Sequence, residues 1–141
     1  MLDLFCGSGF FSIPLSRQGV QVLGVESARA AVRQARTNAR LTGAGEVQFF
    51  ETAVEDSLRD SPDVQPDLIL LNPPRAGAGR EVAKRVAELK AQRIVYVSCN
   101  PSTLGREAAI LTSNGYQLRS LTLVDQFPNT YHIETVALFE R

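Results

Sequence analysis

The segment Ile94–Thr103, IVYVSCNPST, joins an apolar run to a turn of small and polar residues. Its first four residues predict a buried strand of a parallel sheet, because such strands are apolar on both faces. Ligands of open α/β sheets bind at the carboxyl ends of the strands. Cys99, just beyond this strand, is therefore a candidate nucleophile. The alternative is a small buried hydrophobic residue, as most free cysteines are, and position alone does not separate the two.

Short apolar runs alternate with helical periods on both sides of this segment, which predicts an α/β fold with a mostly parallel sheet. We expect strands at residues 1–5, 21–25, 46–50, 67–71, 94–97, 117–125 and 135–139. We expect helices at about residues 10–16, 28–41, 53–58, 80–89 and 102–114. The 141 residues suffice for one domain with a substantial core. Because the chain opens inside its first strand, we expect a fragment of a longer protein.

The composition excludes several classes of protein. With 44% hydrophobic and 21% charged residues it is typical of a soluble globular chain. It contains no apolar run near the roughly 18 residues of a membrane span. We therefore expect a cytoplasmic protein without a signal peptide and without membrane contact. Cys6 and Cys99 lack metal-ligand spacing, so we expect neither a metal site nor a disulfide.

The net charge of zero argues against a free-standing, strongly electrostatic nucleic-acid binder. It does not argue against a catalytic domain whose substrate is held partly by another domain.

The first strand leads into a glycine-containing turn, DLFCGSG at residues 3–9. Asp3 lies at the end of the strand, and Gly7 and Gly9 allow a ligand to approach the backbone before the next helix. An ordinary strand-to-helix turn would look the same. Glu26, however, ends the second strand 19 residues after Gly7, the position of a carboxylate that binds a ribose diol. Together these residues favour a nucleoside-bearing cofactor.

Two further polar residues stand at strand ends. Asn72 follows the strand DLILL and precedes Pro73 and Pro74, which stiffen the turn. Its amide could bond the edge of a planar base, although a simple proline turn is the alternative. Glu134 starts the last strand, so its carboxyl could face the same crevice as Cys99.

One predicted helix carries a basic stripe. Arg29, Arg33, Arg36 and Arg40 lie at spacings that place them on one helix face. The stripe could follow a phosphate backbone, but a solvated helix face is the favoured interpretation.

Three motifs together resemble the catalytic domain of the RNA 5-methyluridine (m5U) methyltransferases, which use S-adenosylmethionine. DLFCGSG is similar to the cofactor loop of that family. NPPRAG followed after 16 residues by IVYVSCNPST is similar to its nucleophile signature, and DQFPNTYHIE at residues 125–134 is similar to its general-base signature. The resemblance covers essentially the whole chain. It implies a Rossmann-like class I methyltransferase fold, in which helices cover both faces of a seven-stranded, mostly parallel sheet with an antiparallel last strand.

The resemblance also implies roles for matching residues. Cys99 would add to C6 of uracil, and Glu134 would remove the C5 proton. The cofactor-binding residues would be Asp3, Phe5, Gly7, Gly9, Phe10, Glu26 and Asn72, with Glu26 on the ribose hydroxyls and Asn72 where cofactor and base meet. Phe10, Phe127 or Tyr131 could stack on a flipped base. Cys6 is expected to pack in the core.

The chain departs from the family pattern at a few positions. Many relatives carry Asp where Asn72 stands, some carry a polar residue in place of Phe10, and Asn129 occupies a position usually filled by Gln, His or Tyr. The upstream RNA-binding region of the family is absent. The resemblance implies an RNA substrate, with ribosomal RNA favoured over transfer RNA, and we expect a monomer.

Two other functions stay open. NPP also occurs in methyltransferases that act on amino groups of RNA or DNA bases, but those enzymes usually have an aromatic residue where Arg75 follows the prolines. Alternatively, residues 1–141 bind the cofactor but are inactive without the upstream domain.

Overall fold

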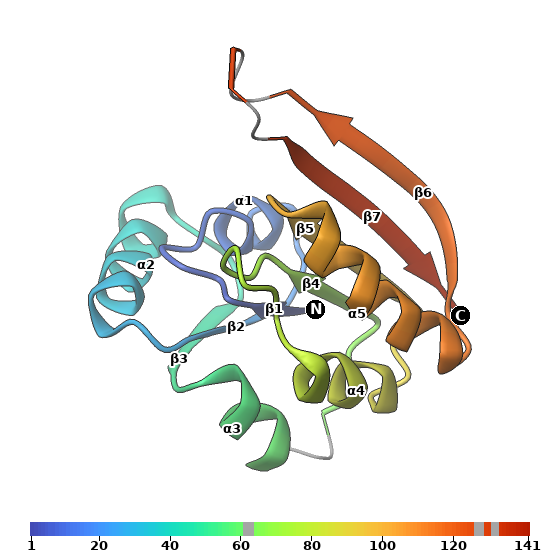
Figure 1. The fold of residues 1–141 in the computed structure, drawn as a ribbon. Coiled ribbons are helices and arrows are strands. Elements are labelled where there is room, and N and C mark those ends of the chain that lie inside the picture. The colour runs from blue at the N-terminus through green and yellow to red at the C-terminus, as the bar shows by residue number, and fades with distance from the viewer. Residues whose placement is uncertain (61–63, 126–128, 131–132) are drawn as a thin grey trace. The chain divides into compact units, whose positions relative to one another are not determined.

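The computed structural model describes residues 1–60, 64–125, 129–130 and 133–141 (Figure 1). The chain divides into two compact units, Met1–Ser61 and Pro62–Arg141. Among the described residues the two units contain seven strands, and the last strand runs antiparallel to its neighbours. The expected mixed α/β fold is confirmed.

The first unit alternates strands and helices. Its elements are β1 (Leu2–Leu4), α1 (Ser12–Ser16), β2 (Val22–Glu26), α2 (Arg29–Thr42), β3 (Val47–Glu51) and α3 (Val54–Asp60). The strands pair in parallel, β1 with β2 and β2 with β3. Gly43 ends α2 in the left-handed conformation (φ 62°), and its N–H bonds to the carbonyl of Ala39. The first helix starts later than the sequence predicted, because Phe10 and Phe11 belong to the preceding turn.

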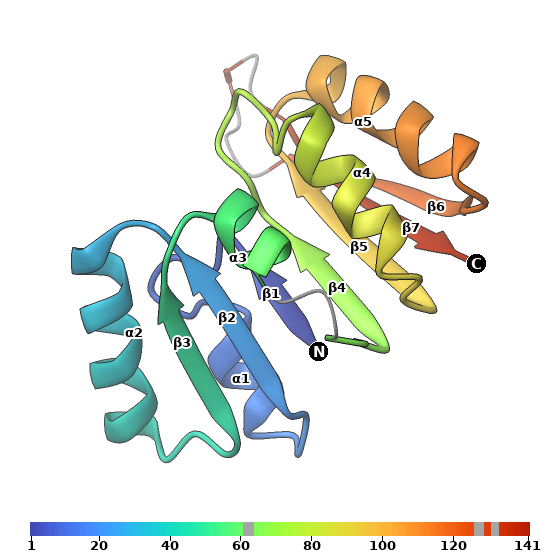
Figure 2. The same ribbon diagram turned by 90° about the horizontal axis from the view of Figure 1, so that it is seen from below.

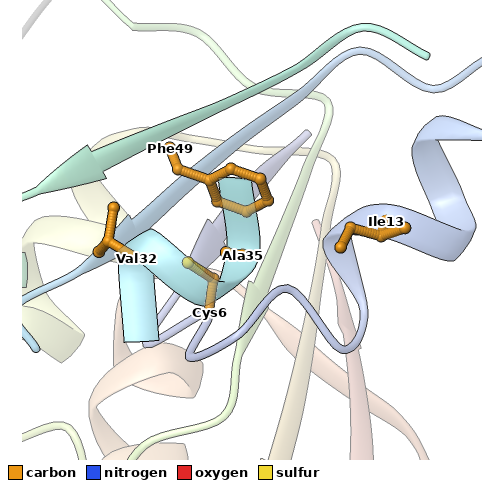
Figure 3. Close-up of a cluster of buried hydrophobic side chains, with 5 residues drawn as sticks. All are labelled: Cys6, Ile13, Val32, Ala35 and Phe49. Carbon is orange, nitrogen blue, oxygen red and sulfur yellow. The ribbon is translucent and has the colours of Figure 1, made fainter. Parts of the chain in front are cut away.

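The core of the first unit lies where α1 and α2 pack on the strands. Figure 3 shows its central cluster, which draws side chains from the β1–α1 loop, both helices and β3. The members are Cys6, Ile13, Val32, Ala35 and Phe49. The core therefore begins directly beneath the glycine-containing turn.

The second unit contains β4 (Leu68–Leu71), α4 (Arg80–Glu88), β5 (Arg93–Ser98), α5 (Pro101–Ser113), β6 (Gln117–Val124) and β7 (Glu134–Glu140). Its strand order is β4-β5-β7-β6, with β4 and β5 parallel and β7 antiparallel to both β5 and β6. Helices α4 and α5 lie on the same face of these strands (Figure 2). No helix of the described residues is both long and apolar enough to cross a membrane.

Burial along β5 and β7 alternates with a period of two. Ile94 and Tyr96 in β5 and Phe139 in β7 are buried. Their neighbours along each strand, such as Val95 and Leu138, are half-buried. Strand residues at alternate positions point to opposite faces. The register of β5 against β7 therefore decides which polar residues at the strand ends share a face.

Candidate functional site

The first unit holds its glycine turn with the carboxylate of Glu26. The N–H of Gly7 donates to Oε2 at 3.1 Å, and the N–H of Ala28 donates to Oε1 at 2.7 Å. The carboxylate is half-buried at the end of β2. Oε1 also accepts from Oγ of Ser27 at 3.3 Å. Oε2 keeps a further lone pair, so the group is fixed in direction and still able to accept from a ligand.

The two glycines of the turn have different tasks. A Cβ at Gly7 (φ 54°) would meet nothing within 4 Å, so this side of the backbone is open. A Cβ at Gly9 (φ 85°) would lie 2.8 Å from Cδ1 of Ile13 and 3.1 Å from Cζ of Phe49. Gly7 therefore leaves room for a ligand, whereas Gly9 allows the turn to pack on the core.

The two phenylalanines of the turn are also unusual. Phe5 adopts a left-handed conformation (φ 62°), which a non-glycine residue adopts only at a cost and which often marks a functional turn. Phe10 is 74% exposed, with its ring edge-on to Phe11 at 5.0 Å between centroids. Both stay predicted ligand-binding residues.

Asp3 is fully buried in the middle of β1, one residue before the strand end where the sequence placed it. Its Oδ2 accepts from Oγ of Ser12 at 2.5 Å, whereas Oδ1 has no partner among the described residues. Burial raises the pKa of Asp3 to about 6, although the hydrogen bonds of Ser12 oppose this shift. A buried acceptor without a donor is costly, and it is the kind of atom that a bound ligand satisfies.

In the second unit, the β5–β7 register brings the nucleophile and base candidates together. Ser98 pairs with Thr135, the last pair of the antiparallel ladder, and Oγ1 of Thr135 donates to the buried carbonyl of Ser98 at 2.8 Å. Cys99 directly follows the last residue of β5, and Glu134 is the first residue of β7. Both side chains are half-buried. The two candidates thus lie next to the same last pair of the ladder.

The turn that carries Cys99 is held by side-chain hydrogen bonds. Oγ of Ser98 accepts from the N–H of Asn100 at 3.1 Å, and Oγ1 of Thr103 donates to the carbonyl of Asn100 at 2.9 Å. Asn100 caps α5, because its Oδ1 accepts from the N–H of Ser102 at 3.1 Å. Pro101 occupies the first helical position, where it is favoured, so α5 begins one residue earlier than expected.

The Asn72 turn is linked to the Cys99 turn. Nδ2 of Asn100 donates to the carbonyl of Arg75 at 3.2 Å. Asn72 is exposed after β4, and Pro73 beside it is buried. Asn72, Cys99 and Glu134 therefore all stand at strand ends of the second unit.

Cys6 has the packing role expected from the sequence. It is 6% exposed within the cluster of Figure 3. Burial, and then the charges of Asp3 and Glu26, raise the pKa of Cys6 to about 12. Its thiolate is strongly disfavoured at neutral pH, so Cys99 stays the candidate nucleophile.

Other expected features have mixed outcomes. Arg29, Arg33, Arg36 and Arg40 are exposed, as both interpretations of the basic stripe require. The aromatic candidates Phe127 and Tyr131 lie outside the described residues. No group of three or more metal-ligating side chains occurs in the described part of the chain.

The sequence analysis missed Glu107 in α5. This residue is 3% exposed, and its carboxylate accepts from Ala78, Gly79 and Tyr96. A signal was available, because Glu107 follows Leu104 by three residues and precedes Leu111 by four, on the buried stripe of α5. A carboxylate on such a stripe needs buried donors.

Comparison with known proteins identifies the family. The family model described as tRNA (Uracil-5-)-methyltransferase matches residues 1–141. The chain belongs to this family. It is 45% identical over 141 residues to the 23S rRNA (uracil(1939)-C(5))-methyltransferase RlmD of Shewanella halifaxensis, covering 99% of this chain and 32% of that relative. The chain thus spans about a third of the length of this relative.

Solved structures agree with the family assignment. The tRNA (uracil-54, C5)-methyltransferase of Pyrococcus abyssi, in complex with S-adenosyl-L-homocysteine, matches with a TM-score of 0.82 and 32% identity, over 98% of this chain and 33% of that one. The precorrin-6y C5,15-methyltransferase of Geobacter metallireducens matches with a TM-score of 0.78 over 100% of this chain and 79% of that one. At 18% identity the second match supports the fold alone.

The burial of Asp3 predicts a pH-dependent penalty on folding. The pKa of Asp3 is 3.8 in the unfolded chain and about 6 in the folded one, so between these pH values the carboxyl is ionised mainly in the unfolded chain. The wild type should therefore lose on the order of 2–3 kcal/mol of unfolding free energy relative to Asp3→Asn between pH 4 and pH 7. Urea denaturation of the ligand-free chain at both pH values measures this difference. The exposed Asp125→Asn is the control, and a pH-independent difference for Asp3→Asn would contradict the assignment.

The two thiols should react at different rates. With iodoacetamide at pH 8, we expect fast alkylation of Cys99 in the folded chain and none of Cys6, because Cys99 is partly exposed whereas Cys6 is buried with a raised pKa. Peptide mass spectrometry locates the label, and denatured protein should be labelled at both positions. Equal labelling of Cys6 in the folded chain would show that its burial is wrong.

Proposed function

We propose that this chain is the catalytic part of an S-adenosylmethionine-dependent methyltransferase that acts on C5 of uridine in RNA. The observation that supports the proposal is the β5–β7 register, whose last pair, Ser98 with Thr135, is flanked by Cys99 and Glu134. A thiol and a carboxylate on one face are what C5 methylation of a pyrimidine needs, whereas amino methylation needs neither. The family membership and the RlmD relative support the same reaction.

The residues of the first unit fit the cofactor. Gly7 offers an open backbone, Glu26 a fixed carboxylate for the ribose hydroxyls, and Asp3 an unpartnered buried oxygen for a donor. Phe5 and Phe10 offer ring surfaces at the same turn. The relative from Pyrococcus abyssi, in complex with S-adenosyl-L-homocysteine, supports this choice of cofactor. When bound, S-adenosylmethionine supplies the electrophilic methyl group that C5 receives.

The protein residues make C5 reactive and then restore the base. C5 of uracil is a poor nucleophile, so the Cys99 thiolate first adds to C6 and shifts the C5–C6 electron pair toward C5 as an enolate. After C5 has gained its methyl group, it still carries a proton. The Glu134 carboxylate removes this proton, the C5–C6 double bond forms again, and the bond from sulfur to C6 breaks. Cys99 leaves as a thiolate and Glu134 holds the proton.

The hydrogen bonds at the strand ends support these reaction steps. The Thr135–Ser98 hydrogen bond fixes the β7 end against the β5 end, and the capped start of α5 fixes the Cys99 turn. Nucleophile and base are thus held by rigid elements rather than by a mobile loop, which lowers the cost of orienting them. Asn72 is proposed to bond the edge of the uracil ring.

Ribosomal RNA is the proposed substrate class. The RlmD relative, which is named for 23S rRNA, is 45% identical, whereas the tRNA-named structure is 32% identical. Because the chain spans about a third of these relatives, we propose that RNA selection depends on other parts of the protein. Cytoplasmic location and a monomeric state stay predictions.

The proposal predicts a sharp effect of Cys99→Ala in the complete gene product. The rate of m5U formation should fall by at least about 10⁴-fold, because removing a covalent nucleophile removes the reaction path. Cofactor affinity should stay within about twofold, because Cys99 is not assigned to that site. Nucleoside mass spectrometry measures m5U in RNA, and calorimetry measures cofactor binding.

Cys6→Ala is the matched control and should remain active. Undiminished m5U formation by Cys99→Ala would contradict the mechanism, and N-methylated nucleosides would point to the amino-directed reaction. The same assay on residues 1–141 alone tests whether this part binds the cofactor but lacks turnover.

A further inference from the structure

The carboxylate of Glu107 holds the loop that follows Asn72. Oε2 accepts from the N–H of Ala78 at 3.1 Å, and Oε1 accepts from the N–H of Gly79 at 3.0 Å. The hydroxyl of Tyr96 also donates to Oε2. Glu107 is 3% exposed, and a buried carboxylate is tolerated only when donors of this kind surround it.

The loop from residue 72 to residue 79 is shaped around this carboxylate. Gly77 adopts a φ of 88°, and a Cβ at this position would overlap Oε1 of Glu107. The N–H of Gly77 closes a turn onto the carbonyl of Pro74 at 2.8 Å. Only glycine combines this conformation with so close an approach. The backbone of residues 77–79 therefore packs closely around the Glu107 side chain from α5.

The three groups that Glu107 joins all belong to segments that carry proposed site residues. Tyr96 lies in β5, three residues before Cys99. Ala78 and Gly79 end the loop that starts at Asn72. Glu107 itself lies in α5, whose capping residue Asn100 directly follows Cys99.

We propose that Glu107 is a positioning residue for uridine methylation, an inference that rests on the function proposed above. Its carboxylate fixes the Asn72 loop relative to the Cys99 turn, so that a base held by the loop presents C6 to the thiol. The hydrogen bond from Asn100 to the carbonyl of Arg75 is the second attachment between the same two segments. Glu107 touches no reacting atom and acts through the loop.

Glu107→Gln tests this inference in the complete gene product. The amide keeps the size of the side chain but leaves one acceptor oxygen for three donors, and its own N–H groups face further donors. We expect kcat for m5U formation to fall by about 10- to 100-fold, because displacements near 1 Å carry costs of this size. KM for RNA should stay within about threefold. Glu88→Gln, an exposed carboxylate on α4, should leave both constants unchanged.

A second measurement separates this inference from the proposed function. Amide hydrogen exchange at Ala78 and Gly79 should accelerate about tenfold in Glu107→Gln and not in Glu88→Gln. If the wild type forms no m5U, the proposed function fails, whereas the exchange data still test the attachment. Unchanged exchange would overturn the attachment, and accelerated exchange with a kcat within twofold of wild type would overturn the positioning role.

Tyr96→Phe keeps the test decisive if Glu107→Gln does not fold. This variant removes one donor and retains the aromatic ring in the core. We expect kcat to fall at least about threefold with KM for RNA unchanged, in protein whose thermal melt shows it fully folded at the assay temperature. Wild-type kcat in folded Tyr96→Phe would overturn the inference.

Discussion

The antiparallel pairing of β5 with β7 is the constraint on which the candidate site depends. A shift of one residue in this register would replace Thr135 opposite Ser98 and so change which residue of β7 lies next to the Cys99 turn, because side chains alternate along a strand. Burial of Ile94, Tyr96 and Phe139 on one face opposes such a shift. The hydrogen bond from Thr135 to Ser98 fixes the last pair of the ladder. Core packing along the two strands thereby fixes which residues stand at the strand ends.

The two units hold their candidate site residues in place in different ways. In the first unit, backbone N–H groups and a glycine with an open side surround one carboxylate, an arrangement suited to a ligand that is bound and released. In the second unit, side chains project from strand ends that are held by hydrogen bonds from α5 and β7. Buried carboxylates occur in both units. Asp3 keeps an oxygen with no hydrogen-bond partner among the described residues, whereas Glu107 has three donors, and this difference agrees with the ligand-binding role proposed for Asp3 and the positioning role proposed for Glu107.

Much of the fold could be predicted from the sequence, because alternating apolar runs and helical periods record local burial. The strands and helices were found within one or two residues, and two of these small differences have local causes. Pro101 extended α5 by one residue at its start, and the turn at Phe10 and Phe11 delayed α1. The different roles of Cys6 and Cys99 were also predicted, and the burial of Cys6 supports its part of that prediction.

The sequence did not indicate the contacts that depend on tertiary packing. Glu107 contacts residues 11 and 29 positions away, and no local pattern reports such distances. The same holds for the link between Asn100 and Arg75 and for the different tasks of Gly7 and Gly9. The assigned roles of Asn72, Phe5 and Phe10 still rest on the family resemblance and stay predictions.

The pairing of Cys99 with Glu134 is tested most directly by Glu134→Gln in the complete gene product, incubated with substrate RNA and S-adenosylmethionine. Without a base to remove the C5 proton, the methylated base should stay attached to the enzyme. Mass spectrometry of the digested protein should then find a methylated uridine adduct on Cys99, and Cys99→Ala combined with Glu134→Gln should abolish it. Turnover of Glu134→Gln at the wild-type rate, or an adduct on another residue, would contradict the mechanism.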